Sequence, residues 1–355
     1  MSSSNDSSRN MESKNDGNAP LPTSHSRQSV PQPDFGPTEV TNVGPSVAAD
    51  QADPTRGALY KGMEARQDSE YERLRMQHEL HKTAMEGKLV RVPLSKDESV
   101  RILDSATGDG LWMVDVSATY PNAQFVGTDI LQKHFEQLQN IPASITFKIQ
   151  SVMDEWPTAD KDAYDLVHQR YCLAMFSPVK GEGIVKRLFE LVKPGGYIQL
   201  VDANLVGYDG GEEHPGMTRL MQFIKRAFTE AGMNPAPGPS LAAWLGKAGA
   251  TDIEETVFSF PMGRLAATPQ AQKSTTANLQ AMIDNFAMIG SSELRPRATW
   301  HSTQQIQCRR PQTETPGYWY SPTDFHTLKQ AVVKEMAETG NTWRFLVVTG
   351  RRKSM

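Results

Sequence analysis

The hydrophobic residues follow two patterns, short continuous runs and positions spaced by three or four. Between Val100 and Asp202 the short runs alternate with helical spacing, which is typical of a sheet built from βα repeats with mostly parallel strands. Because such connections are right-handed, the loops after the strands share one edge of the sheet, where we expect a ligand site. The predicted strands are 100–104, 124–128, 145–150, 164–168 and 197–201, with a tight turn at 193–196.

Helices are predicted on both sides of this segment. No proline interrupts residues 59–89, and Tyr71, Leu74, His78, His81 and Met85 recur at steps of three and four. After Asp202 the pattern predicts helices at 216–231, 240–248, 270–289 and 323–338 and strands at 253–260 and 343–349. The fold class expected is therefore α/β: a doubly wound, mostly parallel, seven-stranded Rossmann-like sheet with N-terminal and lid helices.

Two stretches have neither pattern. Residues 1–56 are rich in Ser, Asn, Asp, Pro and Gly, so we expect a disordered tail, with a docking or regulatory segment as the alternative. Residues 291–320 are rich in Pro, Arg, Thr and Gln and predict an irregular insertion. The remaining organisation expected is a helical lid segment at 57–99, a ligand-binding core at 100–205, and the rest of the same domain at 206–355.

Composition narrows the classes of partner that the protein is expected to bind. A formal net charge of −4 and a pI near 6.1 give no attraction to polyanions, so we expect neither nucleic acid nor an anionic membrane surface as partner. No apolar run approaches the roughly 20 residues of a membrane span, and the amino terminus has no hydrophobic signal segment. Cys172 and Cys308 are too few for a disulfide framework. We expect a cytoplasmic protein, with the nucleus left open, and composition leaves the oligomeric state undecided.

His78 and His81 lie on one face of the predicted N-terminal helix, which raises the question of a metal site. No further Cys, His or carboxylate stands at a recognisable ligand spacing. Packing is the favoured interpretation, and no metal is expected.

A strand-to-helix turn with two glycines, Gly108 and Gly110, follows the apolar run that ends at Asp104. Such a turn lets a ligand approach the backbone closely. A P-loop is excluded because Gly-Lys-Ser/Thr is absent, and a dinucleotide fingerprint is disfavoured because Met113 stands where a third small residue belongs. Asp104 instead suits a cationic ligand such as S-adenosylmethionine, which carries an ammonium and a sulfonium.

Two further strand ends fit the same cofactor. Asp129 ends the second strand about 20 residues beyond the glycine turn, where a carboxylate accepts hydrogen bonds from a ribose diol. Val152, Met153 and Asp154 follow the third strand, and offer apolar groups for an adenine and an acid for its amino group. A helix cap at Asp129 and a turn role for Asp154 are the alternatives.

From about Tyr71 to Leu205 the chain resembles fungal class I S-adenosylmethionine-dependent methyltransferases related to the global regulators of secondary metabolism. The matching motifs are 72–78, 87–89, 108–112, 120–123, 127–129, 155–156, 168–170 and 193–197, and the end of the chain at 347–353 looks like the family's last strand. The chain departs from the family pattern at Ala106, where a glycine is usual, and at Asp109.

The resemblance implies a methyltransferase (EC 2.1.1.-) that methylates O, N or S of a small molecule. The small molecule expected is a fungal secondary metabolite. A cofactor-binding regulatory protein and a protein methyltransferase are the alternatives. S-adenosylmethionine is the cofactor implied, and its expected contacts are Asp104, Ala106, Gly108, Gly110, Asp129, Ile130, Val152, Met153, Asp154 and Gln169.

Methyl transfer requires the acceptor to be held in line with the methyl group, and a base can remove the acceptor's proton. His168, at the end of the fourth strand, is the catalytic candidate; its alternative role is a hydrogen bond to a loop or to the cofactor. Other polar candidates at strand ends and loops are Gln169, Arg170, Asp202, Asn204 and His214. Phe223, Phe228, Met282, Phe286 and Met288 predict an apolar acceptor pocket, with helix core as the alternative.

Overall fold

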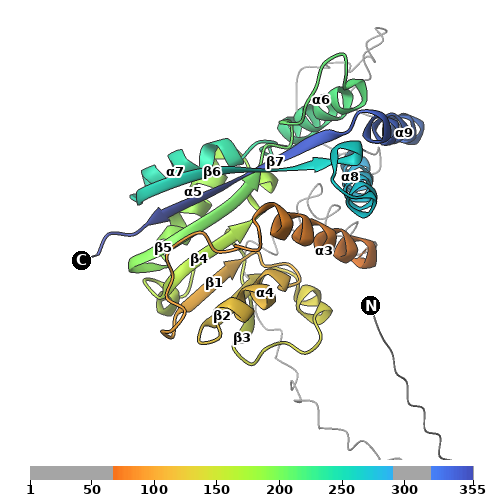
Figure 1. Ribbon diagram of the computed structural model, residues 1–355. Coiled ribbons are helices and arrows are strands. Elements are labelled where there is room, and N and C mark those ends of the chain that lie inside the picture. The colour runs from red at the N-terminus through yellow and green to blue at the C-terminus, as the bar shows by residue number, and fades with distance from the viewer. Residues whose placement is uncertain (1–66, 291–320, 355) are drawn as a thin grey trace, which may run out of the picture. The chain divides into compact units, whose positions relative to one another are not determined.

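The computed structural model describes residues 67–290 and 321–354, so the predicted tail and the insertion at 291–320 lie outside the described residues. Seven strands of the described part form one sheet in the order β3-β2-β1-β4-β5-β7-β6 (Figure 1). β1 to β5 are parallel, and β7 is antiparallel to β5 and β6. The strands are β1 (Arg101–Ser105), β2 (Gln124–Asp129), β3 (Ile145–Ile149), β4 (Tyr164–Arg170), β5 (Val192–Ala203), β6 (Thr251–Met262) and β7 (Asn341–Arg351). The predicted fold class is confirmed.

Helices flank this sheet on both faces. They are α3 (Gln67–Ala84), α4 (Leu111–Thr119), α5 (Pro178–Phe189), α6 (Pro215–Glu230), α7 (Leu241–Ala248), α8 (Pro269–Gly290) and α9 (Pro322–Glu338). Short 3-10 turns are η1 (Gln132–Gln137), η2 (Thr158–Asp160), η3 (Leu173–Met175), η4 (Gly238–Ser240) and η5 (Gly263–Leu265). The predicted helices and strands all correspond to these elements, with boundaries shifted by a few residues.

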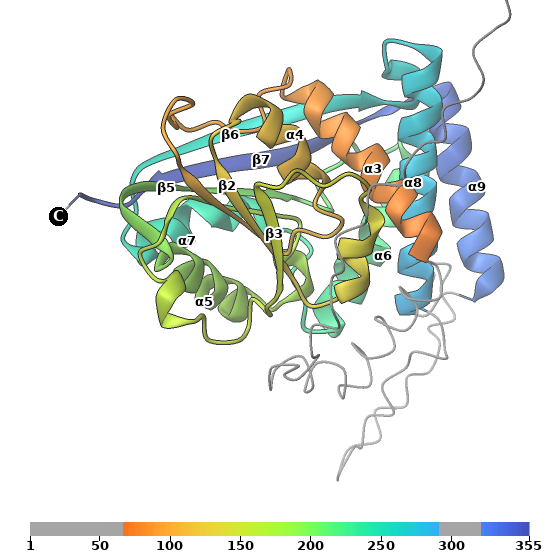
Figure 2. The same ribbon diagram turned by 90° about the horizontal axis from the view of Figure 1, so that it is seen from below.

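Two apolar clusters hold the layers together, one on each face of the sheet. α5 and α7 cover one face (Figure 2), where Leu188 and Leu245 pack with Val167. On the other face Trp112 of α4 joins a cluster that continues into α6, α8 and α9. Complete burial of a Leu or Val side chain stabilises the fold by about 1.5–3 kcal/mol, so the alternation of apolar runs in the sequence is enough to specify the layers.

The predicted turn at 193–196 is wrong in its boundaries. These residues belong to β5, and the pairing register between β4 and β5 shifts between Tyr164 and Leu166. Gly195 has a φ of +83°, and its N–H donates to the carbonyl of Arg352 at 3.0 Å. The Pro-Gly-Gly sequence therefore makes an irregularity inside a long strand, because Arg352, just beyond β7, supplies a backbone partner there.

α3 lies across the edge of the sheet where the parallel strands end, next to α4 and α8 (Figure 1). The Tyr71 hydroxyl bonds His134 Nδ1 of η1 at 2.9 Å, and His78 Nε2 bonds Asp115 Oδ2 of α4 at 3.0 Å. From α8, Asn278 Nδ2 donates to the carbonyl of Arg73 at 3.2 Å. α3 is thus joined to loops and helices that are distant in sequence.

His78 and His81 are each only 1% exposed. The fold also brings donor atoms of His78, Glu79 and Asp115 within 4.8 Å of one another. Lys82 Nζ lies 2.6 Å from Asp115 Oδ2, so an ammonium already supplies positive charge at this carboxylate. The packing interpretation of the two histidines stays a prediction, because the fold brings carboxylates to His78 that the sequence spacing did not reveal.

The structure shows no candidate membrane span among residues 67–290 and 321–354, since none of their long helices carries a sufficiently apolar stretch.

The turn at Gly263, which leads from β6 through η5 toward α8, packs against the C-terminal end of α9 and has no room for a side chain. Its φ is +56°, and a Cβ there would lie 2.2 Å from the backbone carbonyl oxygen of Met336. Gly263→Ala is expected to lower the free energy of unfolding by about 2–4 kcal/mol. Gly246→Ala in α7 is the control, because its Cβ would meet only Ile253 Cδ1 at 3.7 Å. Urea denaturation checks both; equal stability of the two variants would contradict the close approach.

Candidate active site

The glycine turn after β1 is a tight loop with three left-handed residues. Ala106, Gly108 and Gly110 have φ values of +53°, +60° and +76°. The position where the family usually has a glycine is one of them, so Ala106 carries a backbone strain of about 1–2 kcal/mol. A Cβ at Gly110 would lie 2.8 Å from the Phe147 ring. At Gly110 the loop therefore has no space for a side chain, whereas a Cβ at Gly108 would meet only Leu74 Cδ1 at 3.9 Å.

Asp129 ties this loop to the end of β2. Its Oδ2 accepts the Gly108 N–H at 3.0 Å, and its Oδ1 accepts the Ile130 N–H at 2.7 Å and the Leu131 N–H at 3.3 Å. A carboxylate has about four lone-pair sites, so one remains for a further donor. The structure thus places Asp129 and Ile130 beside the glycine turn, and the ribose contact stays a prediction.

The turn after β3 lies next to Asp129. β3 pairs with β2 so that Ile149 is opposite Asp129, and the Gln150 N–H donates to the Asp129 carbonyl at 3.0 Å. Val152 is buried and Met153 half-buried, while the Asp154 N–H closes the turn on the Ser151 carbonyl at 3.2 Å. The predicted adenine residues therefore stand beside the predicted ribose residue.

Asp104 and His168 form a buried pair between β1 and β4. His168 Nδ1 lies 2.7 Å from Asp104 Oδ1, and Thr107 Oγ1 donates to Asp104 Oδ2 at 2.6 Å. The imidazole is 1% exposed and stacks on Trp112 with 3.8 Å between ring centroids. Burial lowers the pKa of His168, and the Asp104 charge acts against that shift. His168 Nε2 has no hydrogen-bond partner within the described residues.

Arg170 and Asp109 carry opposite charges at the same edge. Burial lowers the pKa of the Arg170 guanidinium, while Asp104 and Asp109 raise it. The guanidinium donates a hydrogen bond to His78 Nδ1 at 3.3 Å, and no carboxylate of the described residues is within ion-pair distance. Burial raises the pKa of Asp109, whose Oδ2 is buried without a hydrogen-bond partner in residues 67–290 and 321–354. At this edge the cation of Arg170 and the acid of Asp109 can each bind a further partner of opposite charge.

Gln169 is 2% exposed and faces Ser105, to whose hydroxyl its Nε2 donates at 3.3 Å. Its Oε1 is buried and lacks a partner in the described part of the chain. Three unpaired atoms, from Asp109, His168 and Gln169, therefore surround the glycine turn. Buried polar atoms are nearly always hydrogen-bonded in a complete protein, and all three of these atoms are acceptors, so this edge fits a ligand that brings hydrogen-bond donors.

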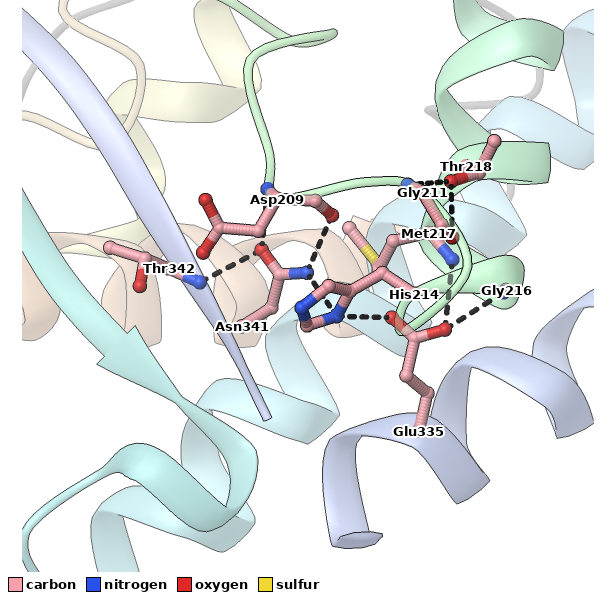
Figure 3. Close-up of polar contacts among 9 residues, drawn as sticks. All are labelled: Asp209, Gly211, His214, Gly216, Met217, Thr218, Glu335, Asn341 and Thr342. Carbon is pink, nitrogen blue, oxygen red and sulfur yellow. Dashed lines mark hydrogen bonds and ion pairs between the residues drawn. The ribbon is translucent and has the colours of Figure 1, made fainter. Parts of the chain in front are cut away.

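The other polar candidates are bound into the scaffold. Asn204 Oδ1 accepts the Val206 N–H at 3.1 Å. His214 lies in a network that Figure 3 shows, in which its Nδ1 is 3.2 Å from Glu335 Oε1 of α9 and 3.3 Å from Asn341 Nδ2 of β7. Glu335 Oε2 also accepts the Gly216 N–H at 2.8 Å. His214 thus anchors the start of α6 to α9 and β7.

A small cavity opens between α3, α8, β6 and β7. Its walls include His81, Asn278, Met282, Phe260, Trp343 and Tyr208. Of the residues predicted to line an apolar pocket, Met282 does so. Phe223, Phe228 and Phe286 do not line this cavity; Phe223 packs edge-on against Phe325, and Phe228 against Phe286. The Met288 side chain lies outside the described residues.

Tyr171 is the residue at this edge that sequence reasoning missed. It follows β4 directly, has a φ of +54°, and its hydroxyl bonds His81 Nε2 of α3. The sequence signal for Tyr171 is its place immediately after the His-Gln-Arg motif, because residues that follow a parallel strand lie at the edge of the sheet where ligands bind.

Comparisons with known proteins agree with this geometry. A family model described as "Methyltransferase domain" matches residues 102–196, from β1 into β5. N-methyltransferase tcpN of Claviceps purpurea (strain 20.1) is 32% identical over 294 residues, which cover 82% of this chain and 97% of the relative. N-methyltransferase gliN of Aspergillus fumigatus is 31% identical over 290 residues, 81% of this chain and 94% of the relative.

The chain belongs to this family of fungal class I S-adenosylmethionine-dependent methyltransferases. The match extends over nearly the whole length of these relatives, and it includes α3 and the helices beyond β5. The methyltransferase prediction is confirmed, and the comparisons give no support to the regulatory or protein-methylating alternatives. Among solved structures, S-adenosyl-L-methionine-bound phosphoethanolamine N-methyltransferase 2 of Haemonchus contortus is similar with a TM-score of 0.41 at 14% identity, covering 78% of this chain and 52% of that one.

Asp202, at the end of β5, generates a pH prediction. It is 2% exposed, and burial raises the pKa of its carboxyl to about 7 against hydrogen bonds from the Ala203 and Leu173 N–H groups. Its unfolded pKa is about 3.9. Between about pH 4 and 7 the folded state therefore holds a proton that the unfolded state releases, so this group makes stability fall as pH rises.

Asp202→Asn removes this titration. The free energy of unfolding of the wild type minus that of the variant should fall by about 2 kcal/mol between about pH 5 and 7. Urea denaturation of both proteins across this range measures it. A difference that is constant or that grows with pH would contradict the raised pKa.

Proposed function

We propose that the protein transfers a methyl group to a nitrogen atom of a small, uncharged natural product. The observation that carries this proposal is the near-complete coverage of relatives named N-methyltransferases. The cavity between α3 and α8 has no carboxylate or ammonium in its lining, which carries the two hydroxyls of Tyr208 and Thr275, two amides and one imidazole among apolar side chains.

The hydrogen-bond donors and acceptors around the glycine turn after β1 fit S-adenosylmethionine. We assign one hydroxyl of the ribose diol to the free lone pair of Asp129, the adenine to Val152, Met153 and Asp154, and close backbone approach to Ala106, Gly108 and Gly110. When bound, the cofactor supplies a methyl group activated on a positively charged sulfur.

Arg170 and Asp109 suit the amino-acid end of the cofactor. The half-buried Arg170 guanidinium, which has no carboxylate of residues 67–290 and 321–354 in ion-pair range, attracts a carboxylate, and the buried Asp109 with its unpaired oxygen attracts an ammonium. Gln169 Oε1 is a further acceptor at this edge. The protein's own charges thus complement both ends of an α-amino acid.

For His168 we favour a positioning role over that of the catalytic base. Asp104 holds its Nδ1, Trp112 covers one face of the ring, and Nε2 is the remaining polar atom. These contacts orient the ring rigidly beneath the glycine turn. Asp104 also has a positioning role, because it holds the His168 ring and accepts a hydrogen bond from the Thr107 hydroxyl.

The partner proposed is thus a small-molecule acceptor, without nucleic acid or membrane. Composition remains the basis for proposing the cytoplasm.

Asp129→Asn tests the cofactor site. Loss of a charge-assisted contact with the ribose hydroxyls should weaken binding of S-adenosylhomocysteine by about 2–4 kcal/mol, tenfold or more in Kd. Titration calorimetry measures this. Asp165→Asn is the control, because that acid lies at the opposite end of β4, where it accepts the Arg101 N–H at 2.8 Å. Unchanged affinity of the Asp129 variant, or an equal loss in both, would remove Asp129 from the site.

Deletion of the gene from its source organism tests the function itself. The deletion strain should accumulate a metabolite lighter by one CH₂ than the wild-type product, and mass spectrometry after feeding methyl-labelled methionine identifies the product. The purified full-length protein should convert the isolated metabolite to its N-methyl form. Identical metabolite profiles of the two strains, or methylation at oxygen or sulfur, would refute the proposal.

A further inference from the structure

The Arg170 guanidinium of β4 has one hydrogen-bond partner within residues 67–290 and 321–354, the imidazole of His78 in α3. Its Nη1 lies 3.3 Å from His78 Nδ1. A guanidinium only donates hydrogen bonds, so His78 Nδ1 presents a lone pair to it. The hydrogen of the neutral ring is therefore on the other nitrogen, Nε2.

Asp115 of α4 accepts that hydrogen. His78 Nε2 lies 3.0 Å from Asp115 Oδ2, and Lys82 Nζ of α3 lies 2.6 Å from the same oxygen. Burial acts to raise the pKa of Asp115, but the hydrogen bonds from Lys82 and His78 outweigh it and lower the pKa. The carboxylate is therefore ionised at neutral pH, and the hydrogen bonds form a chain from β4 through α3 to α4.

His78 stands between the opposite charges of Arg170 and Asp115. Burial lowers the pKa of His78 to about 4, with the Arg170 charge acting in the same direction and Asp115 against it. The ring is neutral at physiological pH, so it holds the guanidinium without neutralising it. A carboxylate in the same place would form an ion pair with Arg170 and compete with a carboxylate of the ligand.

The strand register brings Arg170 to the glycine turn. Gln169 of β4 is opposite Ser105 of β1, so Arg170 is level with the first residue of the turn. Burial lowers the pKa of Arg170, and the charges of Asp104 and Asp109 act against that shift, so the guanidinium is within electrostatic reach of both acids. A guanidinium carries several N–H donors, and those not used by His78 remain for a ligand.

We propose that His78 is a positioning residue that orients the Arg170 guanidinium toward the carboxylate of the cofactor's amino-acid end. This inference rests on the proposed assignment of Arg170 to that carboxylate, and it adds the group that fixes the guanidinium. Asp115 orients His78 in turn, and Lys82 holds Asp115 at the outer end of the chain. α3 thereby contributes to cofactor recognition through a side chain of β4.

Orientation matters because a guanidinium binds a carboxylate best through two parallel hydrogen bonds, which fix the plane of both groups. An arginine side chain has several rotatable bonds, and ordering them during binding weakens affinity. The hydrogen bond to His78 orders the Arg170 side chain in advance. Loss of His78 should therefore weaken the binding of ligands that have the carboxylate and leave the binding of ligands without it unchanged.

Two probes distinguish these ligands in titration calorimetry with the full-length protein. One is S-adenosylhomocysteine, and the other is its decarboxylated form, which keeps the ammonium. Wild type should bind S-adenosylhomocysteine at least about tenfold more tightly, and Arg170→Met should abolish this preference. If wild type lacks the preference, or if Arg170→Met keeps it, the proposed role of Arg170 is wrong and the inference about His78 fails with it.

His78→Leu tests the inference itself. It should weaken binding of S-adenosylhomocysteine about tenfold and change the Kd of the decarboxylated probe by less than about threefold. His78→Gln should restore the preference, because its amide can accept from Arg170 and donate to Asp115. His214→Leu is the matched control: His214 also bonds a carboxylate, that of Glu335 at 3.2 Å, and its loss should leave the preference unchanged.

Two results would contradict the inference while leaving the role of Arg170 intact. One is that Arg170→Met abolishes the preference for the carboxylate and His78→Leu keeps it. The other is that His78→Leu weakens the binding of both probes equally, as a purely structural residue would. If His78→Leu does not fold, Asp115→Ala removes the partner of Nε2 instead; it should reduce the preference at least about threefold, and an unchanged preference would overturn the inference.

Nuclear magnetic resonance of the ¹⁵N-histidine-labelled full chain gives a readout that needs no ligand. At neutral pH the His78 signals should be those of the neutral Nε2–H tautomer, and His78→Gln should remove them. A charged ring or an Nδ1–H tautomer would overturn the proposal, because Nδ1 could not then accept the hydrogen bond from Arg170.

Discussion

The active site depends on a helix that is held by buried polar pairs. α3 crosses the carboxyl-terminal edge of the sheet, and its contacts there are Tyr71 with His134, His78 with Asp115, and His81 with Tyr171. An unpaired buried polar group costs about 1–3 kcal/mol, so each pair penalises a shifted position of the helix. Directional bonds fix the register of α3 more sharply than apolar contacts would, because apolar contacts tolerate sliding.

Through these pairs α3 contacts both the cofactor region at Arg170 and the cavity. His78 lies 3.3 Å from Arg170, which we assign to the cofactor, and His81 lines the small cavity between α3 and α8. Methyl transfer demands that the two reactants be held about 3–3.5 Å apart, and most of the rate advantage comes from that placement. A covering helix that is bonded to both regions supplies such placement, and it also excludes water from the reacting atoms.

The sheet and the glycine turn could be predicted because their signals are local. Apolar runs at strand spacing gave the strands, and Asp129 stood at the right distance from Gly108 to share the turn. The pairing of Asp104 with His168 was hidden because the two are 64 residues apart and meet only through strand register. Tyr171 and His81 are 90 residues apart, so neither belonged to a motif that contained the other. Whether Phe223 and Phe228 face core or ligand could not be decided from the sequence, because a helical apolar stripe looks the same in both cases; in the structure they belong to the apolar core cluster.

The position of α3 over the site is tested most directly by amide hydrogen exchange with and without S-adenosylhomocysteine. We predict slower exchange in the glycine turn and, to a similar degree, in α3 around His78 and His81, because a ligand bound at Arg170, as we propose, would stabilise the pairs that hold the helix. Protection of the glycine turn with unchanged exchange in α3 would contradict the central claim that this helix covers the cofactor and the acceptor.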